Sequence, residues 1–131
     1  MFKLSKMADY SLVLLSHVEE DTLMPVSQLV ERTKLPEPTV YKVMRLLVKA
    51  DIVSSIRGPQ GGYKLSTKSE DISADAIITA IDGSGAITAC TEEGAEECVL
   101  LQSSPAAIRL HKINGAVKLA LQNITLKDLA V

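Results

Sequence analysis

The amino-acid sequence predicts a mainly α-helical fold with one small β-hairpin. Three observations support this prediction. Apolar residues recur at three- and four-residue spacing in several segments, as is typical of amphipathic helices. Two short β-prone runs, 52–56 and 63–66, flank a glycine-rich stretch at 57–62. A later helix-like segment, 105–122, is the longest of the predicted helices.

The composition indicates one domain, or one domain with an appendage. Of the 131 residues, 47% are hydrophobic, which is enough for a packed core. No apolar run is long enough to cross a membrane, and the N-terminus lacks the pattern of a signal peptide, so we expect a cytoplasmic protein with no membrane partner. Aromatic residues make up only 3%, which argues against binding single-stranded nucleic acid by base stacking.

The charges divide the chain into two unlike halves. Residues 1–68 contain ten Lys and Arg and seven Asp and Glu, a net charge of +3, whereas residues 69–131 contain four and nine, a net charge of −5. Phosphate attracts the first half and repels the second. We therefore expect any contact with DNA in the first half. The alternative is that the charges are scattered at random.

The first half contains three predicted helices. The first covers about 5–19, with Ser5 as its N-cap. The second covers about 27–33, with Ser27 as its N-cap. The third covers about 37–50, and the proline and acidic residues at its start suit a first helical turn. The apolar stripe of the third helix consists of Val40, Val43, Met44 and Leu47.

A short turn separates the second and third helices, as in a helix-turn-helix unit. The other side of the third helix is polar and basic, and a hairpin with an arginine at its glycine-rich tip follows. This order predicts a winged helix-turn-helix domain that binds double-stranded DNA. The third helix would enter the major groove, and the wing arginine would enter a narrow minor groove. The candidate DNA-binding residues are Thr39, Tyr41, Lys42, Arg45, Arg57, Gly58 and Pro59.

The second half contains a fourth helix and a short C-terminal turn. Ser73 is the expected N-cap of the fourth helix, and Gly83 is its expected C-terminal stop. Near the end of the chain, Thr125 and Asp128 resemble a capping box in which Asp replaces Glu.

The longest predicted helix begins at Pro105, where Ser104 is typical of an N-cap. At 1.5 Å per residue, residues 105–122 would span roughly 26 Å. The winged domain does not need this additional apolar stripe for its own core. Pairing with a second copy of the chain would cover the stripe and would suit paired DNA half-sites. The alternative is that the helix folds back on its own domain.

Cys90 and Cys98 are the two cysteines of the chain, and four glutamates lie between them. These carboxylates disfavour thiolates by like-charge repulsion, which argues against a nucleophilic pair. A bound iron or zinc ion would reverse that effect. However, structural metal sites usually have four ligands, and a cytoplasmic pair is more often reduced than bridged. The residues alone leave open a metal site, a disulfide-forming redox sensor and a reduced pair.

No pattern in the sequence indicates catalysis. The glycine-rich stretch lacks the Gly-Lys-Ser/Thr ending of a phosphate-binding loop, and it joins two strands instead of opening a helix. His17 and His111 lie in predicted helices with no cysteine near them in the sequence. We therefore do not expect an enzyme.

The chain resembles the IscR-type bacterial repressors, whose relatives sense iron–sulfur clusters, nitric oxide or iron. The most specific stretch is VSSIRGPQGGYKL at 53–65, and LSKMADY at 4–10 and NITL at 123–126 support it. Residues 4–10 and 112–114 are similar to the branch that regulates the SUF cluster-assembly operon. The resemblance implies a homodimeric repressor that binds operator DNA and controls iron–sulfur cluster assembly genes.

In that family, the loop before the long helix carries three cysteines that bind an iron–sulfur cluster, often of the two-iron type. By position, Cys90 and Cys98 match the first two, and Ser104 stands where the third is expected. A hydroxyl is a poorer iron ligand than a thiolate. The resemblance therefore implies a cluster that is labile, held by a substitute ligand or lost, or a serine introduced by engineering. Helix capping alone also explains Ser104.

The resemblance also implies a division of the chain into three parts. These are a winged helix-turn-helix domain at 1–82, a cysteine-bearing sensor loop at 83–104, and a dimerisation helix with a C-terminal turn at 105–131. Two other functions stay open at this point. One is a winged-helix thiol redox sensor, and the other is a winged-helix module that binds a protein and holds no cluster.

Overall fold

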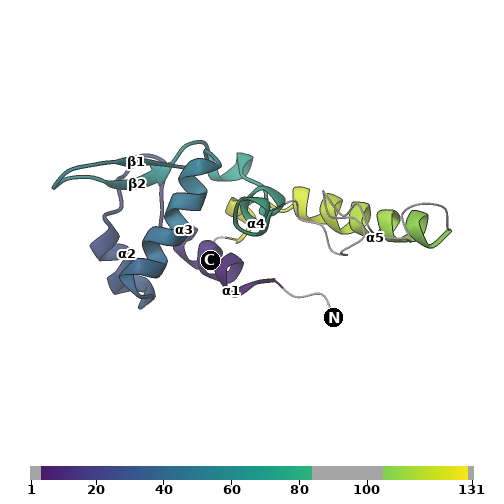
Figure 1. The fold of residues 1–131 in the computed structure, drawn as a ribbon. Helices are drawn as coiled ribbons and strands as arrows, with labels where there is room; N and C mark the ends of the chain where they lie inside the picture. The colour runs from purple at the N-terminus through teal and green to yellow at the C-terminus, as the bar shows by residue number, and fades with distance from the viewer. Residues whose placement is uncertain (1–3, 84–104, 130–131) are drawn as a thin grey trace.

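The structure is a computed structural model that describes residues 4–83 and 105–129, except for the side chains of 105–107. It confirms the predicted mainly helical fold with a two-stranded wing (Figure 1). In chain order the elements are α1 (Lys6–Leu15), α2 (Val26–Thr33), α3 (Glu37–Lys49), β1 (Val53–Ile56), β2 (Gly62–Leu65), the short 3₁₀ helix η1 (Ser69–Asp71), α4 (Ala74–Asp82), α5 (Pro105–Gln122) and α6 (Leu126–Leu129).

The core lies between helices α1 to α4 and the inner side of the wing. The predicted stripe of α3 is confirmed, because all four of its residues are fully buried. Burying one side chain of this size stabilises the fold by about 1.5–3 kcal/mol. The stripe therefore holds α3 firmly against the other helices. Its fully buried neighbours are Leu14, Leu15, Leu29 and Ile77.

Helices α1 and α4 begin at the predicted N-caps. The hydroxyl oxygen of Ser5 accepts the backbone N–H of Ala8 at 3.1 Å, and that of Ser73 accepts the N–H of Ala76 at 3.0 Å. The Ser5 hydroxyl also donates to the carboxylate of Asp82 at 2.7 Å. This last bond joins the start of α1 to the end of α4.

Helix α4 ends where the sequence predicted, whereas α1 ends earlier than predicted. Gly83 ends α4 with a φ of 94°. The first helix was predicted to reach residue 19, but α1 ends at Leu15. There the N–H groups of His17 and Val18 bond to carbonyls three residues earlier instead of four, which tightens the last turn. Val18 nevertheless remains in the core.

The predicted N-cap of the second helix was wrong. Pro25 is the N-cap of α2, and Ser27 lies in its first turn with an exposed side chain. The carbonyl of Pro25 accepts the N–H groups of Gln28 and Leu29, each at 3.1 Å. A proline fits this position because its ring presets the backbone and a helix start needs no N–H from it.

The wing is an antiparallel pair in which Val53 lies opposite Leu65 and Ile56 lies opposite Gly62. A residue from outside the hairpin extends this pairing. Met24 and Tyr63 exchange backbone hydrogen bonds of 2.8 and 2.9 Å, so one antiparallel β-bridge joins the segment before α2 to β2. The wing is thereby attached to the helix-turn-helix unit twice: β1 follows closely after α3, and β2 is bonded to the segment before α2.

The C-terminal segment returns to the core. The N–H of Ala74 donates to the carbonyl of Ile124, and the N–H of Leu126 donates to the carbonyl of Ile72, each at 2.8 Å. The Leu126 side chain is only 5% exposed and packs with the core residues of the first half. The C-terminal segment is thus joined to the start of α4 by backbone bonds and to the core by apolar packing.

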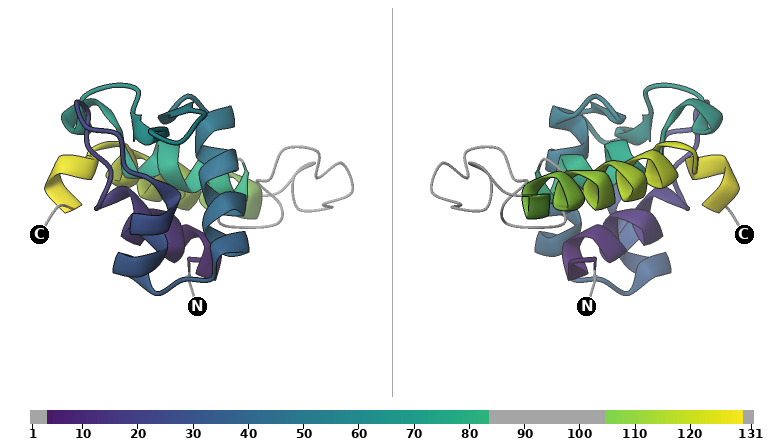
Figure 2. Two further views of the ribbon diagram at one scale, coloured as in Figure 1. Left: turned by 90° about the vertical axis from the view of Figure 1, so that its left-hand side faces the viewer. Right: turned by 90° about the vertical axis from the view of Figure 1, so that its right-hand side faces the viewer.

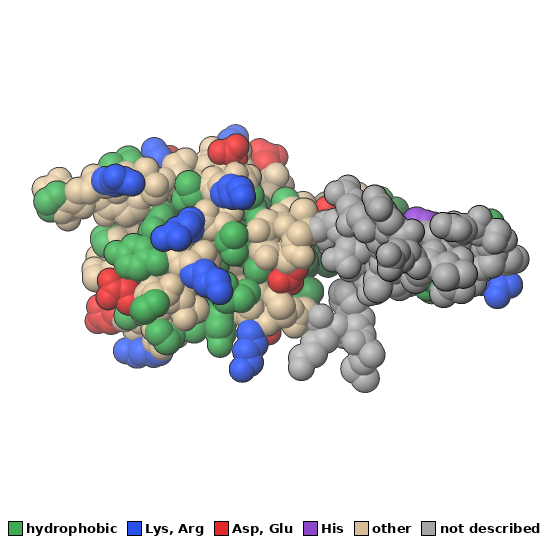
Figure 3. All heavy atoms as spheres, viewed as in Figure 1, with side chains coloured by type: hydrophobic (Ala, Val, Ile, Leu, Met, Phe, Trp, Pro, Cys, Tyr) green, Lys and Arg blue, Asp and Glu red, His purple; other side chains and the backbone are tan. Residues whose placement is uncertain are grey.

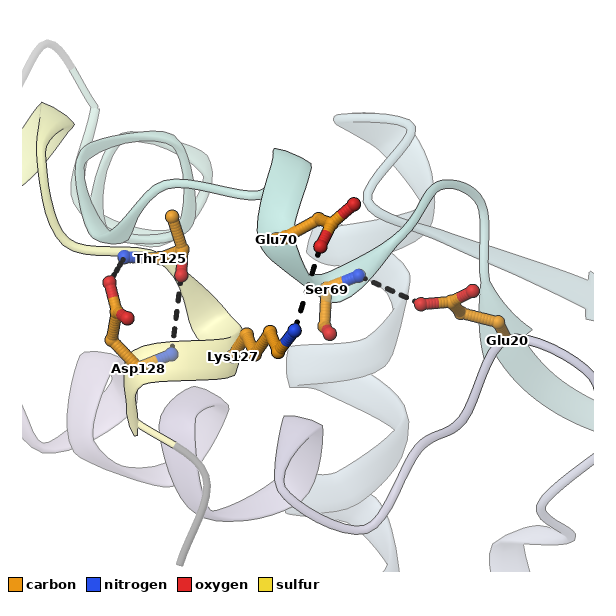
Figure 4. Close-up of polar contacts among 6 residues, drawn as sticks. All are labelled: Glu20, Ser69, Glu70, Thr125, Lys127 and Asp128. Carbon is orange, nitrogen blue, oxygen red and sulfur yellow. Dashed lines mark hydrogen bonds and ion pairs between the residues drawn. The ribbon is translucent and has the colours of Figure 1, made fainter.

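Polar contacts surround this junction (Figure 4). The predicted capping box is confirmed, since Thr125 donates its N–H to the Asp128 carboxylate at 2.9 Å and Asp128 donates its N–H to the Thr125 hydroxyl at 3.2 Å. The first of these bonds lowers the pKa of Asp128. Lys127 and Glu70 form an exposed ion pair at 3.6 Å. Exposed pairs of this kind contribute little, so the two backbone bonds and the buried Leu126 provide most of the attachment.

Helix α5 extends away from the core and packs against α4 (Figures 1 and 2). None of its described residues is buried, although Leu110, Val117 and Leu121 are half-buried. Ile108, Ile113 and Leu119 are 68%, 53% and 59% exposed. Among the described residues, no helix is both long enough and apolar enough to cross a membrane.

We expect Leu126→Ala to lower the free energy of unfolding by about 2–5 kcal/mol, because it removes a buried side chain and leaves a cavity. The control is Leu129→Ala on the same helix, where the side chain is 40% exposed. Urea denaturation followed by circular dichroism measures both. If the two variants have equal stability, the C-terminal helix does not hold the core together.

Candidate nucleic-acid interface

The exposed side of α3 carries four of the predicted DNA-binding residues. Lys42 and Arg45 are exposed, Tyr41 is 44% exposed, and Thr39 is half-buried. Tyr41 and Arg45 lie one helical turn apart, at the spacing that brings side chains together. Because the apolar stripe of α3 faces the core, these polar groups face outward.

The end of α3 turns the chain directly into the wing. Asp51 has a φ of 59°, and its N–H donates to the carbonyl of Val48 at 3.0 Å. The N–H of Ile52 donates to the carbonyl of Leu47, also at 3.0 Å. These two bonds form a Schellman motif, which satisfies the last carbonyls of the helix. Ile52 and Leu47 are both buried in the core, as the hydrophobic contact of this motif requires.

The wing tip is a tight β-turn. The N–H of Gly61 donates to the carbonyl of Gly58 at 2.9 Å, and Pro59 occupies the second turn position, where its fixed φ is suitable. Gly58 has a φ of 115°, which L-residues with a side chain rarely adopt. Arg57, Gly58 and Pro59 are all exposed. The turn therefore presents the predicted wing residues to the outside.

The two glycines after the turn are required for close packing. A Cβ on Gly61 would collide with the carbonyl of Ile56, and a Cβ on Gly62 would lie 2.5 Å from the carbonyl oxygen of Met24. Both obstacles are backbone atoms, which a rotamer change cannot move. Glycine at these positions keeps the wing narrow and lets it approach the segment before α2.

A groove separates α3 from the wing, and the start of α2 forms part of its wall. The groove brings together five of the seven predicted DNA-binding residues. Lys42 and Thr39 lie on α3 and do not line it. Ser27 and Tyr63 also line the groove, although the sequence pattern did not identify either as a site residue. The five predicted residues are Tyr41, Arg45, Arg57, Gly58 and Pro59.

The electrostatic character of this face is basic. Lys and Arg side chains lie over α3 and along the wing, and few acidic side chains lie between them (Figure 3). Inside the groove, burial raises the pKa of Tyr63, the nearby Tyr41 phenol raises it further, and the positive charge of Arg45 lowers it. The groove therefore contains the Tyr63 phenol together with both α3 side chains.

The predicted iron-binding positions, Cys90, Cys98 and Ser104, lie outside the described residues. Within residues 4–83 and 105–129, no group of three or more His, Cys, Asp or Glu side chains could hold a metal ion. His17 and His111 therefore belong to no such group.

Comparison with known proteins agrees with this geometry. The model of the Rrf2 family, described as an iron-dependent transcriptional regulator, matches residues 4–131. The chain is 28% identical over 132 residues to the HTH-type transcriptional regulator NsrR of Oceanobacillus iheyensis, which covers 96% of this chain and 88% of NsrR. It is 31% identical over 106 residues to the HTH-type transcriptional regulator IscR of Sodalis glossinidius, which covers 81% of this chain and 63% of IscR.

Two solved structures are similar over nearly the whole chain. The global cysteine regulator CymR of B. subtilis has a TM-score of 0.79 and 28% identity, and the match covers 99% of this chain and 97% of CymR. IscR of T. potens has a TM-score of 0.71 and 26% identity, and the match covers 97% of this chain and 85% of that one. These structural neighbours share the winged-helix arrangement of α2, α3 and the wing.

Proposed function

The chain belongs to the Rrf2 family of DNA-binding transcription regulators, and we propose that it is a homodimeric repressor that controls iron–sulfur cluster assembly genes. The observation that carries its DNA-binding role is the groove where the exposed side of α3 meets the wing arginine. NsrR, IscR and CymR are all described as regulators, which supports a regulatory and not a catalytic role for this chain. The signal in this proposal is an iron–sulfur cluster or the redox or iron status of the cell.

Helix α3 fits the major groove of double-stranded DNA, which admits one α-helix. Its buried stripe fixes the helix, so that Thr39, Tyr41, Lys42 and Arg45 face the DNA. Tyr41 and Arg45, which line the groove, are suited to base edges, and the exposed Lys42 is suited to phosphate.

The wing extends the contact beyond the major groove. Arg57 is exposed beside the turn of Gly58 and Pro59, and a narrow A·T-rich minor groove attracts arginine by its negative potential. The compact turn, which lacks a side chain at Gly58, allows the backbone to approach the sugar–phosphate chain closely. The wing and α3 would then read two adjacent grooves of one operator half-site.

We expect Arg57→Ala to weaken operator binding by about 1–3 kcal/mol, the range for a good groove contact. Lys42→Ala should weaken binding to all sequences alike and reduce the salt slope by about one, because one phosphate contact is lost. Gel-shift titrations at several salt concentrations measure both effects. Lys127→Ala on α6 is the control and should bind as the wild type does.

The proposed roles of Arg57 and Lys42 can be tested separately. If Arg57→Ala leaves the affinity unchanged at fixed salt, the wing does not enter a groove. If Lys42→Ala changes the preferred sequence but not the salt slope, Lys42 contacts a base and not phosphate. Wild-type binding that does not weaken with salt would instead favour a module that binds a protein.

The homodimer rests on the apolar surface of α5. Three large apolar side chains of this helix, at positions 108, 113 and 119, are more than half exposed, and none of its described residues is buried. With about 3.6 residues per turn, Ile113 lies on a different side of α5 from Ile108 and Leu119, and large apolar side chains exposed along one helix favour burial in an interface. A second copy of α5 would cover part of this helix, and the resulting twofold symmetry would match two operator half-sites.

We expect Ile113→Asp to convert the dimer to a monomer, because a charge in an apolar seam costs several kcal/mol unless it is paired. The Ile113 side chain is 53% exposed in the single chain, so the substitution should leave the fold intact. Light scattering measures the mass, and Leu129→Asp is the control for an exposed apolar position outside α5. A variant that stays dimeric would place the interface elsewhere.

The proposed sensor is an iron–sulfur cluster held by Cys90 and Cys98, with Ser104 at the third position. The donor set suits iron only in part, since two thiolates bind it well and a serine hydroxyl binds it poorly. An iron–sulfur cluster, when bound, supplies sensitivity to oxidants and to iron supply. We propose that this chain holds its cluster loosely and loses it readily.

We expect Ser104→Cys to raise both the iron content and the visible absorbance after anaerobic reconstitution, because it supplies a third thiolate. Ser103→Cys is the matched control, which adds a thiol one residue away. Equal iron in all three proteins would mean that the third ligand lies elsewhere or that no cluster binds. A mass decrease on oxidation in air, without iron, would instead support a redox sensor that forms a Cys90–Cys98 disulfide.

A further inference from the structure

Tyr63 lies where the three parts of the DNA-binding unit meet. It is the second residue of β2, opposite Ser55 of β1, and its half-buried side chain lines the groove with Tyr41 and Arg45 of α3. The start of α2, at Val26, lines the same groove. Tyr63 is therefore a wing residue whose surroundings come largely from the other two elements.

The backbone of Tyr63 is attached to the segment before α2. Its N–H donates to the carbonyl of Met24 at 2.9 Å, and its carbonyl accepts the N–H of Met24 at 2.8 Å. The absence of a side chain at Gly62 makes this close approach possible, as shown by the 2.5 Å that would separate a Cβ from the Met24 oxygen. These bonds fix the backbone of Tyr63 beside the groove that its side chain lines.

The chemistry of the phenol suits a contact with Arg45. An arginine guanidinium has five donors and no acceptor, whereas a neutral phenol both accepts and donates one hydrogen bond. All three side chains line the same groove, and Arg45 and Tyr41 both influence the ionisation of Tyr63. A phenol oxygen that accepts from the guanidinium would leave the other guanidinium donors available for a base edge.

We propose that Tyr63 is a positioning residue, which holds Arg45 in the orientation that reads a base edge in the major groove. The role makes the wing part of base recognition by α3, in addition to its own contact through Arg57. It rests on the proposed DNA-binding function and deepens it.

The test is Tyr63→Phe, which keeps the ring and removes the oxygen. We expect operator binding to weaken about tenfold, the loss for a hydrogen bond to a charged group. The preference for the base pair that Arg45 reads should relax, while the salt slope stays unchanged because no phosphate contact is lost. Tyr10→Phe on α1, also half-buried but outside the groove, is the matched control.

A double-mutant cycle separates positioning from simple packing. In an Arg45→Ala background, Tyr63→Phe should have no further effect on affinity or on base preference, since there is no guanidinium to orient. Additive effects, or an unchanged base preference in the single variant, would overturn the proposal. Circular dichroism and denaturation confirm that each variant is folded.

A second measurement needs no DNA and therefore distinguishes this proposal from the function on which it rests. In a chain with Tyr10→Phe and Tyr41→Phe, Tyr63 is the remaining tyrosine of the three, and ultraviolet absorbance follows its titration. Adding Arg45→Ala should raise the pKa of Tyr63, because the positive charge that lowers it is gone. An unchanged pKa would show that the two side chains do not interact, whatever the outcome of the DNA experiments.

Discussion

The structure depends above all on the burial of one side of α3. Val40, Val43, Met44 and Leu47 are fully excluded from water, and α3 packs against α1, α2, α4 and β1. Because a helix has a fixed period, burying this stripe determines the direction of every other side chain on α3. Tyr41, Lys42 and Arg45 face outward for that reason. The apolar core thus sets the geometry of the candidate interface without contributing any atom to it.

Two local features then place the wing beside α3. The Schellman motif at Asp51 reverses the chain at the end of the helix, and its buried contact between Ile52 and Leu47 sets the direction of β1. The exchange of hydrogen bonds between Met24 and Tyr63 holds β2 from the other side. A hairpin of two strands is marginally stable alone, so these attachments explain how a short wing can keep a defined tip. Glycine at position 62 is what permits the second attachment.

The C-terminal residues link the two functions proposed for the chain. Leu126 belongs to the same core as α3, and backbone bonds join residues 124–126 to the start of α4. The end of α5 is therefore held on the DNA-binding unit, while the rest of that helix extends from it with exposed apolar side chains (Figure 1). A second copy bound along α5 would be oriented relative to α3 through this junction. The spacing of two α3 helices in a dimer would follow from this rigid connection.

Sequence alone determined the features that depend on neighbouring residues. The stripe of α3, the caps at Ser5 and Ser73, the stop at Gly83 and the box of Thr125 and Asp128 all follow from helical periodicity or from hydrogen bonds over three or four residues. The hairpin was also predictable, since strand propensity and turn residues are local signals.

Tertiary structure decided the features that depend on residues far apart in the chain. Nothing in the local pattern indicated that Met24 pairs with Tyr63, that Ser27 and Tyr63 share a groove with Arg45, or that Leu126 completes the core of the first half. The start of α2 was misplaced for a related reason: a serine and a proline both suit a helix start, and the pairing of Met24 with the wing favours Pro25. Such contacts arise only when the helices have packed, because their energy comes from burial and backbone pairing between distant segments, which no short window of sequence contains.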